Sequence, residues 1–205
     1  MSQSLDNLQK QLDHTKSIQD FRSAIQSAVR RLWGGGEYFS FVDAMNFVLQ
    51  RHLTIAWNEG AAICGIQPDE LSDSEIAARE RFINEQFSYL LNFADSIEDG
   101  SKLNGGLLST HFTRAEMWIN RYNDAINQSK LLVCKDQKLK WIYGDTQHCS
   151  DCNKLNGRVY RASVWDKYGV YPQSRSLSCK GYRCQCRLEP TTERANSGQP
   201  PRLRG

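Results

Sequence analysis

Hydrophobic residues in the first 130 positions of the chain recur at the spacing of α-helices. Between residues 5 and 32 they form one apolar stripe that begins with Leu5 and Leu8. Gly34-Gly35-Gly36 then ends the pattern, because glycine costs about 1 kcal/mol inside a helix. A second helix is predicted over about residues 41–64. Its inward residues are Val42, Met45, Leu49, Leu53, Ala56 and Trp57.

Two capping-box spacings predict two further helices. Ser72 followed by Glu75 starts a third helix, whose apolar face, including Leu91, continues to residue 97. Residues 100–106 are rich in turn formers, and Thr113 with Glu116 then opens a fourth helix. Four helices of this length joined by short loops predict a helical bundle or array over residues 1–133.

The pattern changes after Lys130. Residues 131–133, 140–143 and 158–160 are short and strand-like. Residues 134–190 are therefore expected to form a small α+β module with short strands. Residues 191–205, where Leu203 is the one large apolar residue, are expected to be a flexible basic tail. The predicted fold class is mainly α.

Cysteine is concentrated in one stretch of this module. Five of the seven cysteines lie between positions 149 and 186, whereas Cys64 and Cys134 stand alone. The first residues, MSQSLDNLQK, lack the basic and apolar segments of a secretory signal, so the protein is expected to fold in a reducing cytoplasm, where disulfides are rare. The cluster therefore predicts a metal site, with disulfide pairing as the less favoured alternative.

The cysteine spacing predicts one structural zinc ion that stabilises the module. Cys149-x-x-Cys152 lets two thiolates reach one metal from a tight turn, and two further sulfurs complete the tetrahedron that zinc prefers. We predict Cys184 and Cys186 as this second pair, with Cys179 as the substitute. Four thiolates fill the coordination sphere, which indicates a structural site. The ion would supply folding free energy that a segment poor in apolar side chains lacks.

Two other interpretations of this stretch are less favoured. A redox Cys-x-x-Cys normally opens a helix after a strand, whereas Asn156-Gly157 predicts a turn after this one. His148 precedes Cys149 directly, and adjacent residues rarely point at the same metal, so we expect it at the surface or behind the ligands.

Charge is divided unevenly along the chain. Residues 1–129 carry 11 Lys and Arg against 17 Asp and Glu, whereas residues 130–205 carry 15 against 6. A basic second half suits contact with a polyanion or an acidic protein surface, and a solvated basic surface without a partner explains it equally well.

The cysteine stretch resembles the C-terminal module of the phage head morphogenesis family, the minor head proteins similar to protein F of phage Mu and their SPP1-like relatives. The resemblance covers roughly residues 113–188. Members close the module with His-x-x-Cys-Arg-Cys, whereas this chain has Gly181 in place of the His and Gln185 in place of the Arg. Cys179 is the candidate to replace the missing His. The residues that carry the resemblance are Trp141, Cys149, Cys152, Gly157, Pro172, Cys184 and Cys186.

The resemblance implies a minor head (capsid) protein of a tailed bacteriophage that acts in head morphogenesis near the portal. The implied partners are the portal and/or major capsid protein, with packaged DNA as a further candidate for the basic C-terminal module. The implied location is the virion head, after assembly in the host cytoplasm. No apolar run approaches the roughly 20 residues that cross a bilayer, so no membrane partner is expected.

Two other classes of function compete with this one. A zinc-ribbon nucleic-acid-binding protein is the alternative, because aromatic residues lie among Lys and Arg, although packing of a small metal-bound core explains them better. An enzyme is not expected, because the signatures of zinc deaminases, His-Glu-x-x-His metalloproteases, Gly-x-Ser-x-Gly hydrolases and phosphate-binding loops are absent. The aromatic residues concerned are Tyr160, Trp165, Tyr168, Tyr171 and Tyr182.

Overall fold

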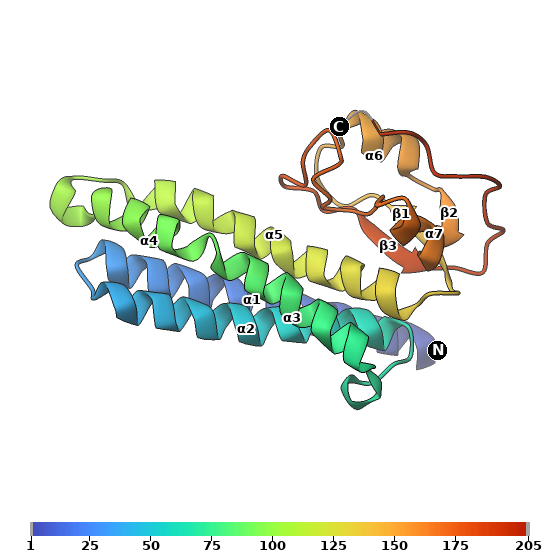
Figure 1. Ribbon diagram of the computed structural model, residues 1–205, viewed down its shortest axis with the longest axis horizontal. Coiled ribbons are helices and arrows are strands. Elements are labelled where there is room, and N and C mark those ends of the chain that lie inside the picture. The colour runs from blue at the N-terminus through green and yellow to red at the C-terminus, as the bar shows by residue number, and fades with distance from the viewer. Residues whose placement is uncertain (1, 204–205) are drawn as a thin grey trace. The chain divides into compact units, whose positions relative to one another are not determined.

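The computed structural model describes residues 2–203, except for the side chains of residues 2–8, 10 and 11. The predicted apolar positions Leu5 and Leu8 therefore lie outside the described side chains. The fold is mainly α with a small α+β module, as predicted (Figure 1). The longer helices are α1 (Ser2–Trp33), α2 (Tyr38–Ile63), α3 (Asp73–Phe87), α4 (Leu90–Asp99) and α5 (Leu108–Val133), and the shorter ones are α6 (Ser150–Leu155), α7 (Ala162–Lys167) and the 3-10 turns η1 (Pro68–Glu70) and η2 (Lys102–Asn104).

The chain packs as two compact units, which we call the helical unit and the module unit. The helical unit comprises Met1–His52 and Ile83–Ile119, and the module unit comprises Leu53–Phe82 and Asn120–Gly205. The division does not coincide with the expected boundary after residue 133, because the second halves of α2 and α5 pack with the cysteine-rich segment.

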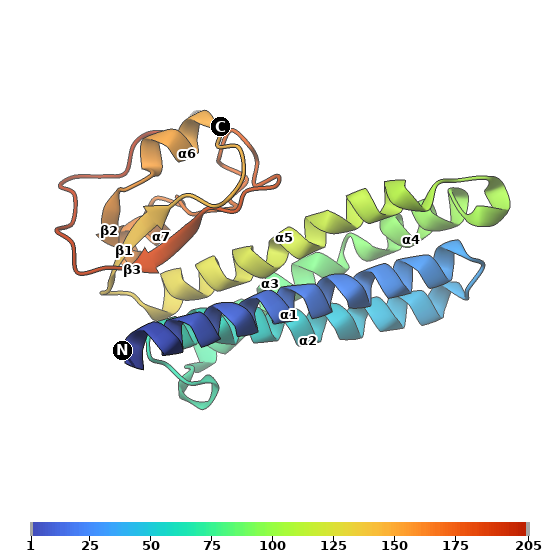
Figure 2. The same cartoon turned by 180° about the vertical axis from the view of Figure 1, so that it is seen from behind.

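An apolar core holds the helical unit together. α1 and the first half of α2 run side by side (Figure 2), and α1 also packs against α4. The ring centres of Phe93 and Trp118 lie 4.8 Å apart, and those of Phe41 and Phe93 lie 6.1 Å apart. Arg22 of α1 also makes two hydrogen bonds, of 2.9 and 3.0 Å, to the carboxylate of Glu116 on α5.

The third predicted helix is two helices. Glu75 accepts a 2.9 Å hydrogen bond from the Ser72 backbone N–H, so the predicted capping residue starts α3 where expected. The helix then breaks at Ser88, whose hydroxyl donates to the carbonyl oxygen of Glu85 at 2.7 Å. Leu91, predicted to face inward, lies in α4 after this break and is 54% exposed.

The fourth helix is longer at both ends than predicted. It begins at Leu108, and Thr113 lies inside it with its hydroxyl bonded to the Ser109 carbonyl at 3.0 Å. The strand predicted over residues 131–133 is wrong, because these residues form the last turn of α5. Leu131 is buried there in the core of the module, which explains the apolar triplet without a strand.

The module contains a three-stranded antiparallel sheet in the order β2-β1-β3. Its strands are β1 (Lys138–Ile142), β2 (Val159–Arg161) and β3 (Arg187–Pro190). The first two match predicted strands, and β3 was not predicted. Side chains of β1 point alternately to the two faces of the sheet, and Leu139 and Trp141 are on the buried face. Trp141 pairs with Leu188 in β3.

The C-terminal half of α5 covers the outer edge of β3. Asn127 accepts the Leu188 backbone N–H at 2.9 Å, and the Lys130 ammonium donates to the Leu188 carbonyl at 2.7 Å. Both side chains are buried. Polar groups of α5 thus satisfy an edge that would otherwise be open to pairing with another strand.

The described part of the expected flexible tail, residues 191–203, lies against the sheet. Asn196 pairs with Val159 through two hydrogen bonds of 2.7 and 2.8 Å, and the Tyr160 hydroxyl donates to the Gln199 carbonyl. Leu203 packs on the module core. Backbone pairing, which composition does not reveal, therefore fixes this segment to the module.

Cys64 and Cys134, which the sequence left isolated, form a disulfide with their Cα atoms 5.5 Å apart. The bond links the segment after α2 to the end of α5 within the module unit. Among the described residues, no helix has the length and apolarity that would allow it to cross a bilayer.

Candidate metal centre

All five clustered cysteines converge in the module. Their sulfurs form two groups that share Cys152, and within each group every sulfur lies within 4.8 Å of the others. We call Cys149, Cys152 and Cys179 the outer group, and Cys152, Cys184 and Cys186 the inner group. The four predicted ligands and the predicted substitute thus lie in one region that could hold a metal ion, but the predicted four do not form a single mutually close group.

The Cys-x-x-Cys segment is shaped by the start of α6. Cys149 is the N-cap residue, and its sulfur accepts the Cys152 backbone N–H at 3.4 Å. The two sulfurs are also 3.4 Å apart. The segment therefore opens a short helix and the predicted turn comes after it, where Gly157 has φ +77° and donates its N–H to the Trp141 carbonyl at 2.9 Å. The neighbouring strands are antiparallel, so this is not the parallel βαβ setting of a redox motif.

The other three cysteines come from an irregular loop with unusual backbone angles. Lys180, Gly181 and Arg183 all have φ between 49° and 75°. A Cβ on Gly181 would lie 2.1 Å from the Gln173 carbonyl oxygen, so the backbone passes too close for any side chain. A histidine therefore does not fit at position 181, where members of the family that the sequence resembles have one.

A buried glutamine fixes this loop to α5. The Gln173 amide donates to the carbonyls of Cys184 and Cys186, both at 2.8 Å, and its oxygen accepts from Asn127 at 2.7 Å. Gln173 itself has φ +64°, a left-handed conformation that a non-glycine residue adopts at some cost. Sequence reasoning missed Gln173, because nothing in its neighbourhood marks it as a partner of two later cysteines.

Crowding of the thiols moves their pKa values in opposite directions. Hydrogen bonding from Cys152 and Cys184 lowers the pKa of Cys186 to about 3, whereas the contacts with Cys184 and Cys186, together with burial, raise the pKa of Cys152. At Cys149, burial raises the pKa, but hydrogen bonds from Ser178 and Cys152 outweigh it and bring the pKa to about 7. Burial raises the pKa of Cys179 to about 12. Thiols this close hold protons between them that a cation would displace.

His148 is the sixth potential donor at the cluster. Its Nδ1 lies 3.8 Å from the Cys186 sulfur, and its ring stacks on Tyr143 at 3.7 Å with a 10° angle between planes. The Tyr143 hydroxyl donates to Asn153 of α6 at 2.8 Å. Its position beside Cys149 in sequence had suggested a residue outside the ligand shell, but the loop directs it toward Cys186 instead.

Buried aromatic and acidic groups surround the sulfurs. The Trp141 ring packs 5.8 Å from Trp165 in the same core as Cys152, Cys184 and Cys186. Asp151, fully buried inside the Cys-x-x-Cys segment, accepts from the Ser178 backbone N–H at 2.9 Å and pairs with Lys154 at 3.0 Å. The carboxylate thereby ties α6 to the loop that carries Cys179.

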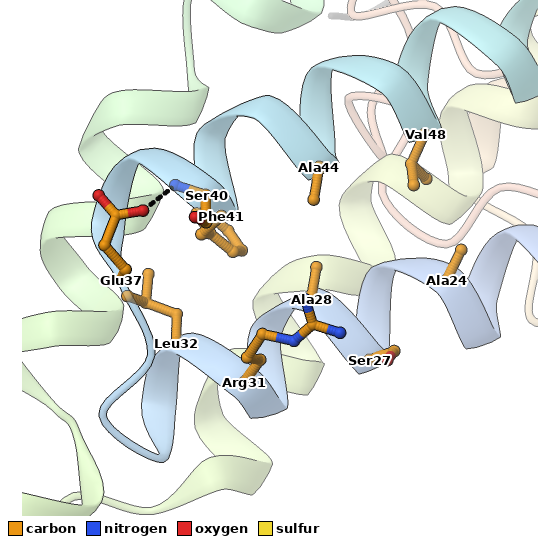
Figure 3. A pocket seen from close by; sticks show the side chains of 10 residues that line it. All are labelled: Ala24, Ser27, Ala28, Arg31, Leu32, Glu37, Ser40, Phe41, Ala44 and Val48. Carbon is orange, nitrogen blue, oxygen red and sulfur yellow. Dashed lines mark hydrogen bonds between the residues drawn. The ribbon is translucent and has the colours of Figure 1, made fainter.

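A pocket in the helical unit offers no comparable chemistry. It lies between α1 and α2 and is lined mainly by small and apolar side chains, among them Ala24, Ala28 and Ala44 (Figure 3). Of its ionisable residues, Glu37 accepts the Ser40 backbone N–H at 2.6 Å and so caps α2. We interpret the pocket as a gap between two helices that meet through small residues.

Comparison of the chain with models of protein families, with curated proteins and with solved structures gave no match in any of the three.

Proposed function

We propose that this chain is a minor head protein of a tailed bacteriophage, acting in head morphogenesis near the portal, and that its cysteine cluster holds structural zinc. The convergence of five cysteines in one small module carries the proposal. The portal and/or major capsid protein are the proposed partners, the virion head is the proposed location, and the proposed role is not enzymatic.

The residues that carry the family resemblance have physical roles at the cluster, which supports the proposal. Trp141 is fully buried in the core that also contains Cys152, Cys184 and Cys186. Gly157 takes the left-handed turn after α6 and bonds to Trp141. Cys184 and Cys186 present their backbones to Gln173. The spaced pattern in the sequence thus corresponds to a single packed unit.

Zinc is the metal that best fits this donor set. Thiolate ligands favour zinc, Cu(I) or iron–sulfur clusters, and zinc is the usual ion of structural all-cysteine sites. The predicted ligands Cys149, Cys152, Cys184 and Cys186, with Cys179 beside them, supply enough sulfur. Zinc analysis of the purified full chain is expected to give at least one ion per chain.

Assembly is the test of the head-protein role. The full chain is co-expressed with the portal and major capsid proteins encoded in the same genome, and purified heads are examined by quantitative mass spectrometry. We expect the chain in few copies per head and portal protein co-purifying with it. Cys152→Ser should weaken the association, and Tyr168→Ala, which keeps the whole cluster, is the control. Heads that form normally and contain none of the chain would refute the role.

A zinc-ribbon nucleic-acid-binding protein is the second candidate, and one observation favours it. Tyr182 is 57% exposed with the Arg183 guanidinium 5.3 Å from its ring centre, and Tyr168 is 45% exposed with the Lys167 ammonium at 5.8 Å. Exposed aromatic rings next to cations suit stacking on single-stranded nucleic acid. Binding of the full chain to DNA that weakens steeply with salt and is lost in Tyr182→Ala would support this candidate.

A further inference from the structure

The five sulfurs are arranged as two overlapping triangles, and a single tetrahedral ion would arrange them differently. One ion with Zn–S bonds of about 2.3 Å holds four sulfurs about 3.8 Å from one another. Four sulfurs bound to one such ion would therefore all lie close to one another. Among the described residues the sulfurs instead form the outer and inner groups, each of three, with Cys152 common to both.

We propose that the cluster binds two zinc ions that share the Cys152 thiolate. The inference rests on the proposal that the cluster holds zinc, and it adds a second ion and a bridging ligand. The outer ion takes Cys149, Cys152 and Cys179. The inner ion takes Cys152, Cys184 and Cys186. His148, whose Nδ1 lies near the Cys186 sulfur but outside this close group, turns toward the ion as its fourth ligand.

The position of His148 supports the inner ion. Its Nδ1 lies 3.8 Å from the Cys186 sulfur, close to the separation expected of two donors on one tetrahedral ion. Stacking on Tyr143 fixes the plane of the ring, and Tyr143 is itself bonded to Asn153 on α6. The stacking contact therefore holds the ring in an orientation in which Nδ1 lies near the Cys186 sulfur.

Charge also favours a second ion. Five thiolates around one divalent cation leave three negative charges in a largely buried place, and two cations reduce the excess to one. The carboxylate of Asp151, which lies between Cys149 and Cys152 in the sequence and is fully buried, adds to the negative charge and is already paired with Lys154. Uncompensated charge in a buried site is costly, so a second cation removes a large unfavourable term.

Burial distinguishes the two ions. Cys152, Cys184 and Cys186 are buried, whereas Cys149 and Cys179 of the outer group are partly exposed. The outer ion has three protein ligands and a fourth position that faces solvent. It should therefore exchange faster than the inner ion, and a competing chelator should remove the two zinc ions in two separate steps.

Metal stoichiometry of the full chain tests the proposal. Elemental analysis after saturation with zinc and removal of the excess is expected to give two ions per chain, released by chelator in a fast and a slow step. In the cadmium-substituted protein, NMR should show two cadmium signals that split each other through the shared sulfur. One ion per chain would overturn the bridged pair while leaving a zinc module intact, and no bound metal would overturn both.

Variants separate the two ions without depending on Cys152, whose loss could unfold the module. Cys179→Ser should remove the fast ion and its signal and leave one ion per chain. His148→Ala should shift the signal of the slow ion and speed its release by at least tenfold, the lower end of the effects seen for altered ligand shells. Tyr168→Ala, at a half-exposed position of the module, is the control and should keep both ions. A His148→Ala protein with unchanged signals and release would overturn the assignment of the fourth ligand.

Discussion

The helical unit and the module unit are stabilised in different ways. The interior of the helical unit is apolar, with Phe21, Ile25 and Phe93 fully buried along long helices. The cysteine-rich part of the module unit, residues 134–190, has helices of six residues and strands of three to five. Its interior places tryptophans beside thiols and buried polar groups such as Gln173. Burial of apolar side chains stabilises the first arrangement, whereas the second also brings five thiols together, where we propose that zinc binds.

Removal of the metal should have the largest effect on stability. It should unfold the module and leave the helical unit folded. Structural zinc contributes roughly 10–16 kcal/mol in small zinc-binding peptides, so the chelated module should lose its fold. Hydrogen exchange should become fast in residues 138–190 and remain slow in the helical unit. Cys152→Ser should reproduce this result at saturating zinc. Protection that persists throughout the chelated chain would show that the module folds without metal.

Chelation of the metal should change the stability cost of a core substitution in the module but not that of one in the helical unit. Trp165→Ala deletes a fully buried indole that donates to the Leu139 carbonyl at 3.0 Å, and Phe93→Ala deletes a fully buried ring of the helical unit. Each should reduce the free energy of unfolding by about 3–5 kcal/mol with zinc present.

After chelation, Phe93→Ala should keep its cost in thermal or urea unfolding, and Trp165→Ala should lose it because its surroundings are already unfolded. Tyr168→Ala, at a half-exposed position one turn after Trp165 in the module, is the control and should change stability by less than about 0.5 kcal/mol. Equal costs for both core variants after chelation would mean that the two units do not differ in this way.

Predictions from the sequence were most accurate where residues close together in the chain determine the structure. Helical periodicity and the Ser72–Glu75 cap located the helices, and the cysteine spacing located the cluster. The errors occur where contacts between residues far apart in the sequence determine the secondary structure. The apolar triplet 131–133 continues a helix because the module core receives it, and β3 forms because Asn127 and Lys130 satisfy its outer edge.

The same limit applies to the candidate site. Spacing identified the cysteines but not their grouping, because the left-handed angles at Lys180 and Arg183 determine where each sulfur points. His148 approaches Cys186 through a loop whose path no local pattern indicates. Cys64 and Cys134 are 70 residues apart, and only the packing of the end of α2 against α5 brings them together.

Lys130 should make the stability of the module unit depend on pH. Burial lowers its pKa from 10.5 to about 8, with Arg187 acting in the same direction and Glu189 and Glu59 opposing it. Between these values the unfolded chain binds the proton and the folded chain does not, so the free energy of unfolding should rise with pH, by up to about 3 kcal/mol from pH 8 to 10.5.

Because cysteines and tyrosines also titrate in this range, the informative quantity is the difference between the wild-type chain and Lys130→Met. Urea unfolding followed by the signal of the module tryptophans gives this difference. As the pH rises, the free energy of unfolding of the wild-type chain should increase relative to that of Lys130→Met by the stated amount. The stability of Lys130→Met relative to the wild type should therefore be higher at pH 7 than at pH 10.5. A difference that stays constant with pH would show that Lys130 has an ordinary pKa in the folded protein.

The smallest predicted effect concerns the polar connection between α5 and the cluster. Asn127, 1% exposed, accepts from the Leu188 N–H and donates to Gln173, which holds the carbonyls of Cys184 and Cys186. Asn127→Ala leaves a buried N–H without its partner and should cost about 1–3 kcal/mol, with faster zinc release because the loop is less firmly held. Gln128→Ala, on the partly exposed side of the same turn, is the matched control. If Asn127→Ala destabilises the chain but leaves zinc release unchanged, the network supports the sheet alone, and the cluster depends on its metal rather than on α5.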